Sequence, residues 1–183
     1  MPLGPYSLSR LQTLQPTVQP IFKSFLEQCE AAGIPCEAVQ GTRTFAAQQA
    51  LYNQGIDNDP STPKVTNAKP GDSYHQYALA LDVVPHAYKS LPEWNPSGPY
   101  WERIGQIGES LGLQWGGRWS KPDKPHFQFA GAPISELKAY WEKFKAIMPI
   151  EVTPTATAIV AGLTLAFLFW FVLKPQLERH GIL

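Results

Sequence analysis

Histidine and aspartate residues gather in two short stretches of this 183-residue chain, SYHQYALALD at 73–82 and DKPHFQF at 123–129. The first contains His75 and Asp82, and the second contains Asp123 and His126. Two imidazoles and one carboxylate are a normal ligand set for zinc, which leaves a fourth tetrahedral position for water. A second carboxylate near that water serves a hydrolase as general base. The two stretches therefore predict a zinc site with hydrolytic chemistry.

Each of these residues also has an ordinary structural explanation. Asp82 interrupts the apolar run LALDVV, where a carboxylate is costly to bury unless it is paired. Arg43 is an alternative partner for it, and His75 would then lie at the surface. The conjunction of two histidines with two acids favours the metal site. His86, at the expected end of a strand, is predicted to be a surface residue, and His180 lies too far along the chain to contribute.

The hydrophobic pattern predicts the elements that would position these residues. Apolar residues recur at helical spacing in four segments, 18–32, 44–54, 99–111 and 135–147. Short strands are expected in four others, 35–39, 79–84, 113–115 and 126–129. Segment 56–72, rich in Asp, Asn, Pro and Gly, is expected to be a surface loop. Asp82 is thus expected inside a strand, and His75 in a loop before it.

Composition narrows the classes of partner. Lys and Arg total 15, as do Asp and Glu, so the chain has no broad basic field and nucleic acid is not expected as a partner. The two cysteines, Cys29 and Cys36, are predicted to be buried thiols near a helix end and the following strand. A disulfide is the weaker alternative, and zinc ligation is weaker still because no CxxC spacing is present.

A long uncharged segment lies near the C-terminus. No charge occurs from Val152 to Leu173, and residues 156–173 are strongly apolar. A helix of 18–22 residues spans about 27–33 Å, enough to cross the hydrocarbon core of a bilayer. Aromatic residues crowd the distal end, which Lys174 closes. A membrane helix is predicted, with a buried core helix as the alternative.

The expected organisation follows from these segments. Residues 1–147 form the folded domain, 148–155 a linker, 156–173 the transmembrane helix and 174–183 a short polar tail. No cationic segment followed by an apolar run marks the N-terminus, so no signal peptide is predicted. The tail has two cations against one acid, which weakly favours a cytoplasmic tail. A tail anchor with the domain facing the cytoplasm requires only the short tail to cross.

Three ordered motifs resemble VanY-like zinc peptidases, most closely the phage endolysins that act as L-alanyl-D-glutamate peptidases. The motifs are GTRTFAAQQALYNQG, VTNAKPGDSYHQYALALDVV and WGGRWSKPDKPHFQF, and the similarity runs from about Leu8 to Phe129. The resemblance implies the α+β fold of LAS-type zinc peptidases, a small antiparallel sheet flanked by helices. It also implies Zn²⁺ as cofactor and bacterial peptidoglycan as partner.

The resemblance assigns roles to eight residues. The zinc-ligand positions of the family are matched by His75, Asp82 and His126. The general base is matched by Asp123, and the arginine that holds the scissile carbonyl oxygen by Arg43. The positions that shape the substrate site are matched by Gln48, Ser73 and Trp115. In the implied reaction Asp123 takes a proton from the zinc-bound water and later protonates the leaving amine. Zinc and Arg43 would together stabilise the oxyanion.

The chain departs from the family pattern at three positions. Ala78 stands where a glycine is usual, which is tolerable at negative φ and damaging at positive φ. Ala47 replaces a common acid beside Gln48. Arg118 stands where WGG is usually followed by Asp, a change expected to affect substrate preference at the rim of the cleft.

The expected function is cleavage of the L-Ala–D-Glu bond of peptidoglycan by a phage endolysin or virion lysin that causes lysis. The expected location is a host inner membrane or a virion membrane, reached through residues 156–173. One alternative is a D-Ala-D-Ala carboxypeptidase of the same fold. Another is a module that binds the cell wall without cutting it.

Overall fold

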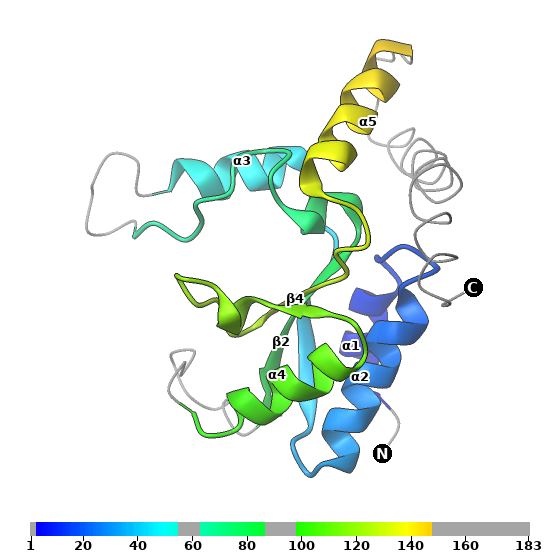
Figure 1. Ribbon diagram of the computed structural model, residues 1–183, viewed down its shortest axis with the longest axis vertical. Coiled ribbons are helices and arrows are strands. Elements are labelled where there is room, and N and C mark those ends of the chain that lie inside the picture. Colours follow the sequence, from blue (N-terminus) through cyan, green and yellow to red (C-terminus); the bar gives the residue numbers. More distant parts are fainter. Residues whose placement is uncertain (1–2, 55–62, 87–97, 148–183) are drawn as a thin grey trace.

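The computed structural model describes residues 3–54, 63–86 and 98–147, and a four-stranded antiparallel sheet lies at its centre (Figure 1). The strands are β1 (Cys36–Gln40), β2 (Ala80–Pro85), β3 (Gln114–Trp115) and β4 (His126–Gln128), in the order β1-β2-β4-β3. Helices α1 (Pro5–Leu11) and α2 (Gln19–Ala31) pack on β1, and α4 (Trp101–Ser110) packs against α2 and β3. The α+β fold with a small antiparallel sheet, as predicted, is confirmed.

Two further helices lie toward the other end of the sheet (Figure 1). They are α3 (Phe45–Asn53) and α5 (Ile134–Ile147), and they meet where the rings of Phe45 and Trp141 stack with centroids 4.6 Å apart. The helix predicted over 44–54 is confirmed as α3, and the Thr44 side chain caps its start by accepting a hydrogen bond from the backbone N–H of Ala47. Helix α5 begins one residue earlier than predicted.

The sheet separates an apolar core from a polar face. On β2, Leu81 and Val83 are fully buried in the core, whereas Asp82 between them points to the opposite face. Antiparallel pairing places Asp82 directly across from His126 of β4 and from Gln40 of β1. Register alone therefore brings one predicted ligand beside another that lies 44 residues later in the chain.

Two elements differ from the sequence predictions. Helix α1 was not predicted, because it is only 7 residues long and buries only Ser7 and Leu11. His75 lies in the 3₁₀-helix η1 (Tyr74–Tyr77) rather than in an irregular loop, so the expectation of a loop there is wrong. The single turn of helix is too short to show an apolar period, which explains why the pattern missed it.

The two cysteines are buried free thiols on α2 and β1, as predicted. A hydrogen bond with Cys29 and burial both raise the pKa of the Cys36 thiol, which keeps it protonated and unreactive at neutral pH. The predicted membrane helix over 156–173 falls outside the residues described here. Within the described ranges, no helix has the length and apolar character needed to cross a bilayer.

Ala78 adopts the left-handed conformation, with φ of +59°, and its side chain is fully buried. This conformation costs a residue with a Cβ about 1–2 kcal/mol. Ala78→Gly removes that cost and loses about 0.8 kcal/mol of methyl burial. We expect a net gain of roughly 0.5 kcal/mol in the free energy of unfolding, measured by urea denaturation.

Ala78→Val serves as the contrasting variant. A β-branched side chain is strained at positive φ, so this variant should be less stable by about 2 kcal/mol or more. Equal stability of the valine and glycine variants would show that the backbone at position 78 is not constrained.

Candidate active site

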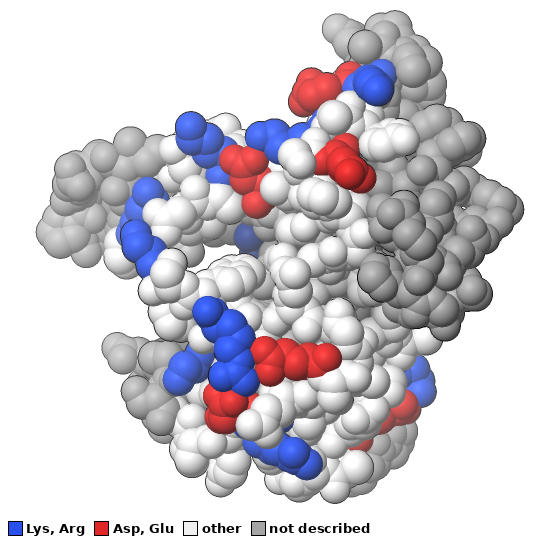
Figure 2. All heavy atoms as spheres, in the orientation of Figure 1, with Lys and Arg blue, Asp and Glu red and all other residues white. Residues whose placement is uncertain are grey.

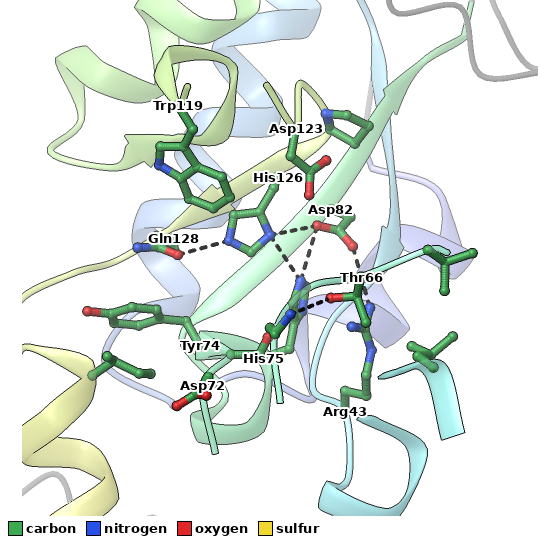
Figure 3. A pocket seen from close by; sticks show the side chains of 16 residues that line it. Arg43, Thr66, Asp72, Tyr74, His75, Asp82, Trp119, Asp123, His126 and Gln128 are labelled. Atoms are coloured by element: carbon green, nitrogen blue, oxygen red, sulfur yellow. Dashed lines mark hydrogen bonds and ion pairs between the residues drawn. The ribbon is translucent and has the colours of Figure 1, made fainter. Parts of the chain in front are cut away.

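Three predicted ligands converge on one point (Figure 3). Asp82 Oδ1 lies 3.1 Å from His75 Nε2 and 3.0 Å from His126 Nδ1, and the two ring nitrogens are 3.2 Å apart. Zinc bonds of about 2.0–2.1 Å in a tetrahedron imply ligand atoms about 3.3–3.4 Å apart. The triangle of donor atoms therefore fits a tetrahedral metal ion with only a slight outward movement, and both imidazole and carboxylate are ligands that zinc accepts.

Hydrogen bonds on the far side of each imidazole orient it toward the triangle. His75 Nδ1 lies 2.7 Å from the carbonyl oxygen of Gly41, which can only accept, so this nitrogen carries the proton and leaves Nε2 free to ligate. His126 Nε2 lies 3.0 Å from Gln128 Oε1, which frees Nδ1 in the same way. Such outer partners fix the tautomer that a metal requires. Gly41 and Gln128 were not identified from the sequence.

Gly41 can pack closely against the end of α1 because it has no side chain. A Cβ at this position would lie 2.3 Å from Thr13 Oγ1 and 2.7 Å from the Arg10 carbonyl oxygen. The turn after β1 is therefore held tightly against the end of α1. The same turn is fixed on its other side, where the Arg43 N–H donates to the His75 carbonyl oxygen at 3.0 Å.

The charges of the triangle depend on one another. Burial alone would raise the pKa of Asp82, but the charges and hydrogen bonds of His75 and His126 outweigh it and hold that pKa well below its usual range. Burial would lower the pKa of His126, and the bond to Asp82 outweighs this and raises it. A metal ion that binds here must displace a proton from this cluster, so its affinity falls in acid.

Asp123 lies at the open side of the triangle. Its carboxylate points toward Asp82 and His126 from the loop before β4 (Figure 3). That loop is closed by the Asp123 N–H, which donates to the Gly116 carbonyl oxygen at 3.0 Å. Partial burial and the negative charge of Asp82 raise the pKa of Asp123. A carboxylate with a raised pKa beside the triangle is suited to accept and return a proton.

Arg43 approaches the triangle from the opposite wall of the cleft. Its Nη2 lies 3.8 Å from Asp82 Oδ2, so the pairing considered as an alternative to the metal site exists together with the triangle. Its Nη1 donates to Gln48 Oε1 at 3.0 Å, and Gln48 Nε2 donates to the Ala68 carbonyl oxygen at 2.8 Å. Buried Gln48 thus orients Arg43 and does not itself line the cleft.

The triangle, Asp123 and Arg43 line one cleft of about 590 Å³. It appears as a hollow between the part of the molecule that carries α3 and the loop before β4 (Figure 2). Ser73 lines it. Trp115 does not: it is buried, its ring stacks on Phe127 with centroids 6.2 Å apart, and its indole N–H donates to the Lys124 carbonyl oxygen. Trp119 lines the cleft instead.

The remaining departures from the family pattern lie outside this cleft. Arg118 donates to Glu102 and Glu109 of α4, and its guanidinium lies 4.9 Å from the ring centre of Trp115. It therefore braces the loop that precedes the cleft and does not line the cleft itself. Ala47 is exposed on α3.

Gln128→Leu is expected to weaken metal binding by about 10- to 100-fold, because His126 loses the acceptor that fixes its tautomer. The measurement is a competition titration of Zn²⁺ against a chromophoric chelator. Gln114→Leu is the control, since Gln114 Oε1 accepts from the amide nitrogen of Gln128, at 3.1 Å, and not from the group that faces His126. If both variants bind the metal as tightly as the parent chain, Gln128 does not orient the ligand.

Comparison with known proteins shows similarities of sequence and of fold. A peptidase M15 family profile described as D-alanyl-D-alanine carboxypeptidase matches residues 66–129, which include the triangle and Asp123 but not Arg43. The peptidoglycan L-alanyl-D-glutamate endopeptidase CwlK of Bacillus subtilis (strain 168) is 32% identical over an alignment of 123 residues, which covers 61% of this chain and 72% of CwlK.

Solved structures share the fold. The LdcB LD-carboxypeptidase superposes with a TM-score of 0.53 at 18% identity, over 69% of this chain and 64% of LdcB. VanYB, in complex with D-alanine-D-alanine, gives a TM-score of 0.51 at 14% identity, over 71% of this chain and 77% of VanYB. At these identities the likeness concerns the fold alone.

Proposed function

This chain belongs to the peptidase M15 family, and on that premise we propose that it is a zinc-dependent endopeptidase that hydrolyses the L-Ala–D-Glu bond of peptidoglycan. The observation that carries the proposal is the convergence of His75, Asp82 and His126 within one cleft that also holds Asp123 and Arg43. The similarity to CwlK, which spans most of that enzyme, supports this choice of bond.

Zinc bound at the triangle would supply Lewis acidity to a water molecule and to the scissile carbonyl group. Asp123 accepts a proton from the attacking water and donates one to the leaving nitrogen. The C–N bond breaks, which leaves L-Ala with a carboxylate and D-Glu with a free amine. The guanidinium of Arg43, held by Gln48, stabilises the negative charge that develops on the carbonyl oxygen.

A D-Ala-D-Ala carboxypeptidase is the second candidate, because the matching family profile carries that description. Digestion of purified muropeptides followed by mass spectrometry separates the possibilities. An endopeptidase releases a peptide that begins with D-Glu, whereas a carboxypeptidase releases free D-Ala. A module that only binds the wall releases neither. Release of D-Ala without any new D-Glu amine would overturn the proposed bond.

We also propose that residues 156–173 anchor the enzyme in a host inner membrane or a virion membrane, where it serves lysis. The support is the uncharged stretch from Val152 to Leu173. Leu165→Arg places a charge in the middle of this stretch and should move the full chain from the membrane to the soluble fraction on centrifugation. Leu8→Arg, which lies outside this stretch, is the control and should stay in the membrane fraction. If Leu165→Arg also stays there, the anchor is excluded.

A further inference from the structure

Trp119 is a large aromatic side chain left open to solvent in the cleft. It is 41% exposed and lines the cleft. Its ring lies beside His126, with centroids 5.1 Å apart and planes tilted by 44°. Among the residues that the structure describes, none forms a hydrogen bond with its indole nitrogen. One ring face and one N–H donor are therefore available to a ligand next to the metal triangle.

The loop that carries Trp119 is held by hydrogen bonds within it and by ion pairs to α4. The backbone N–H of Trp119 donates to the Gly116 carbonyl oxygen at 3.1 Å, and the backbone N–H of Asp123 donates to the same oxygen at 3.0 Å. Arg118 ties the same loop to α4 through Glu102 and Glu109. The ring is thus held in place before a ligand arrives, which lowers the entropic cost of binding.

The two walls of the cleft differ in charge. On the wall that carries Arg43, the guanidinium faces Asp82 and Asp123 (Figure 3). On the other wall Trp119 lies with uncharged Tyr74 and Gln128 (Figure 3), and Asp72 near them is neutralised by Lys138 at 2.7 Å. The Arg43 wall therefore carries the charged groups of the cleft, and an uncharged group with apolar C–H surface fits the Trp119 wall.

The two sides of the scissile bond differ in the same sense. D-Glu continues the peptide through one of its carboxyl groups, and its other carboxyl group can remain free and anionic. L-Ala is joined through an uncharged lactyl group to the muramic acid sugar. The sugar begins about two residue lengths, or roughly 7 Å, from the scissile carbonyl carbon. The Trp119 ring lies next to that of His126, with centroids 5.1 Å apart, so a group that extends beyond the triangle along this wall meets it.

We propose that Trp119 determines specificity by stacking on the muramic acid ring that precedes L-Ala, so that the enzyme prefers glycan-bearing substrate over free peptide. This inference rests on the function proposed above. The C–H groups of a pyranose carry partial positive charge and face the negative π-cloud of the indole. The free indole N–H donates to a sugar hydroxyl group.

The test compares two substrates with the full chain loaded with Zn²⁺. One is the free stem peptide that begins with L-Ala, and the other is the same peptide linked to N-acetylmuramic acid. We expect Trp119→Ala to lower the ratio of kcat/KM for the glycan-bearing over the free peptide by about tenfold, mainly through KM. Trp119→Phe keeps a ring face and should retain most of the ratio.

Tyr100→Ala is the matched control, since Tyr100 is equally exposed at 41% and does not line the cleft. It should leave the ratio as it is in the parent chain. An equal loss on both substrates in Trp119→Ala would overturn the sugar subsite while the endopeptidase function stands. If the parent chain cleaves neither substrate between L-Ala and D-Glu, the proposed function fails and the subsite fails with it.

Discussion

Asp123→Asn is expected to lower kcat on muropeptides by about 10²- to 10⁴-fold while metal binding is retained. The amide has nearly the shape of the carboxylate but cannot accept a proton from water or return one to the leaving amine. Asp123 lies outside the triangle of donor atoms, which consists of His75, Asp82 and His126. Chemistry and metal affinity should therefore separate in this variant.

The measurement pairs a steady-state assay with zinc analysis of the same sample. Asp72→Asn is the matched control, because Asp72 also lines the cleft and its carboxylate is held by Lys138. We expect that variant to lose less than about tenfold in kcat. Residual activity of Asp123→Asn at the level of the control would exclude Asp123 as the general base.

Removal of the metal should abolish hydrolysis by the parent chain. In Asp82→Asn, added Zn²⁺ should fail to restore the activity. Asp82 Oδ1 is the only anionic corner of the triangle and lies within 3.1 Å of both imidazole nitrogens. A neutral amide at this position lowers affinity for a dication, and Arg43 also loses its carboxylate partner. Loss of the several kcal/mol that a metal contributes corresponds to about 10³-fold or more in rate.

The experiment treats the parent chain and Asp82→Asn with a chelator and then adds stoichiometric Zn²⁺. The parent chain should regain activity, and the variant should remain inactive and bind less than one equivalent. Glu37→Gln is the control, since Glu37 is a strand carboxylate 3.8 Å from exposed His86. Full zinc occupancy in Asp82→Asn would show that this carboxylate is not a ligand.

Local pattern determined most of the elements. The apolar spacing over 18–32 predicted α2, and that over 44–54 predicted α3. These signals depend on residues a few positions apart, which the sequence displays directly. Short elements were less visible: η1 has only 4 residues, and its left-handed end at Ala78 carries a side chain where glycine would have been the usual signal.

The residue types of the site could also be read from the sequence, but their arrangement could not. His75 and His126 turn different ring nitrogens toward the triangle, because Gly41 and Gln128 occupy the other sides of their rings. A backbone carbonyl carries no signature in the sequence, and a glutamine resembles many polar strand residues. The packing of the turn after β1 against η1 brings Gly41 to His75, and the extended backbone of β4 puts Gln128 beside His126.

The sequence by itself determined which side chains can bind a metal and move a proton, because this depends on residue chemistry and on motifs that are local. The tertiary structure decided how they meet and which of two tryptophans lines the cleft. Trp115 and Trp119 are four residues apart in WGGRW. Strand pairing buries Trp115 against Phe127, and the following turn directs Trp119 into the cleft. Such a choice depends on contacts between distant segments, which no local pattern encodes.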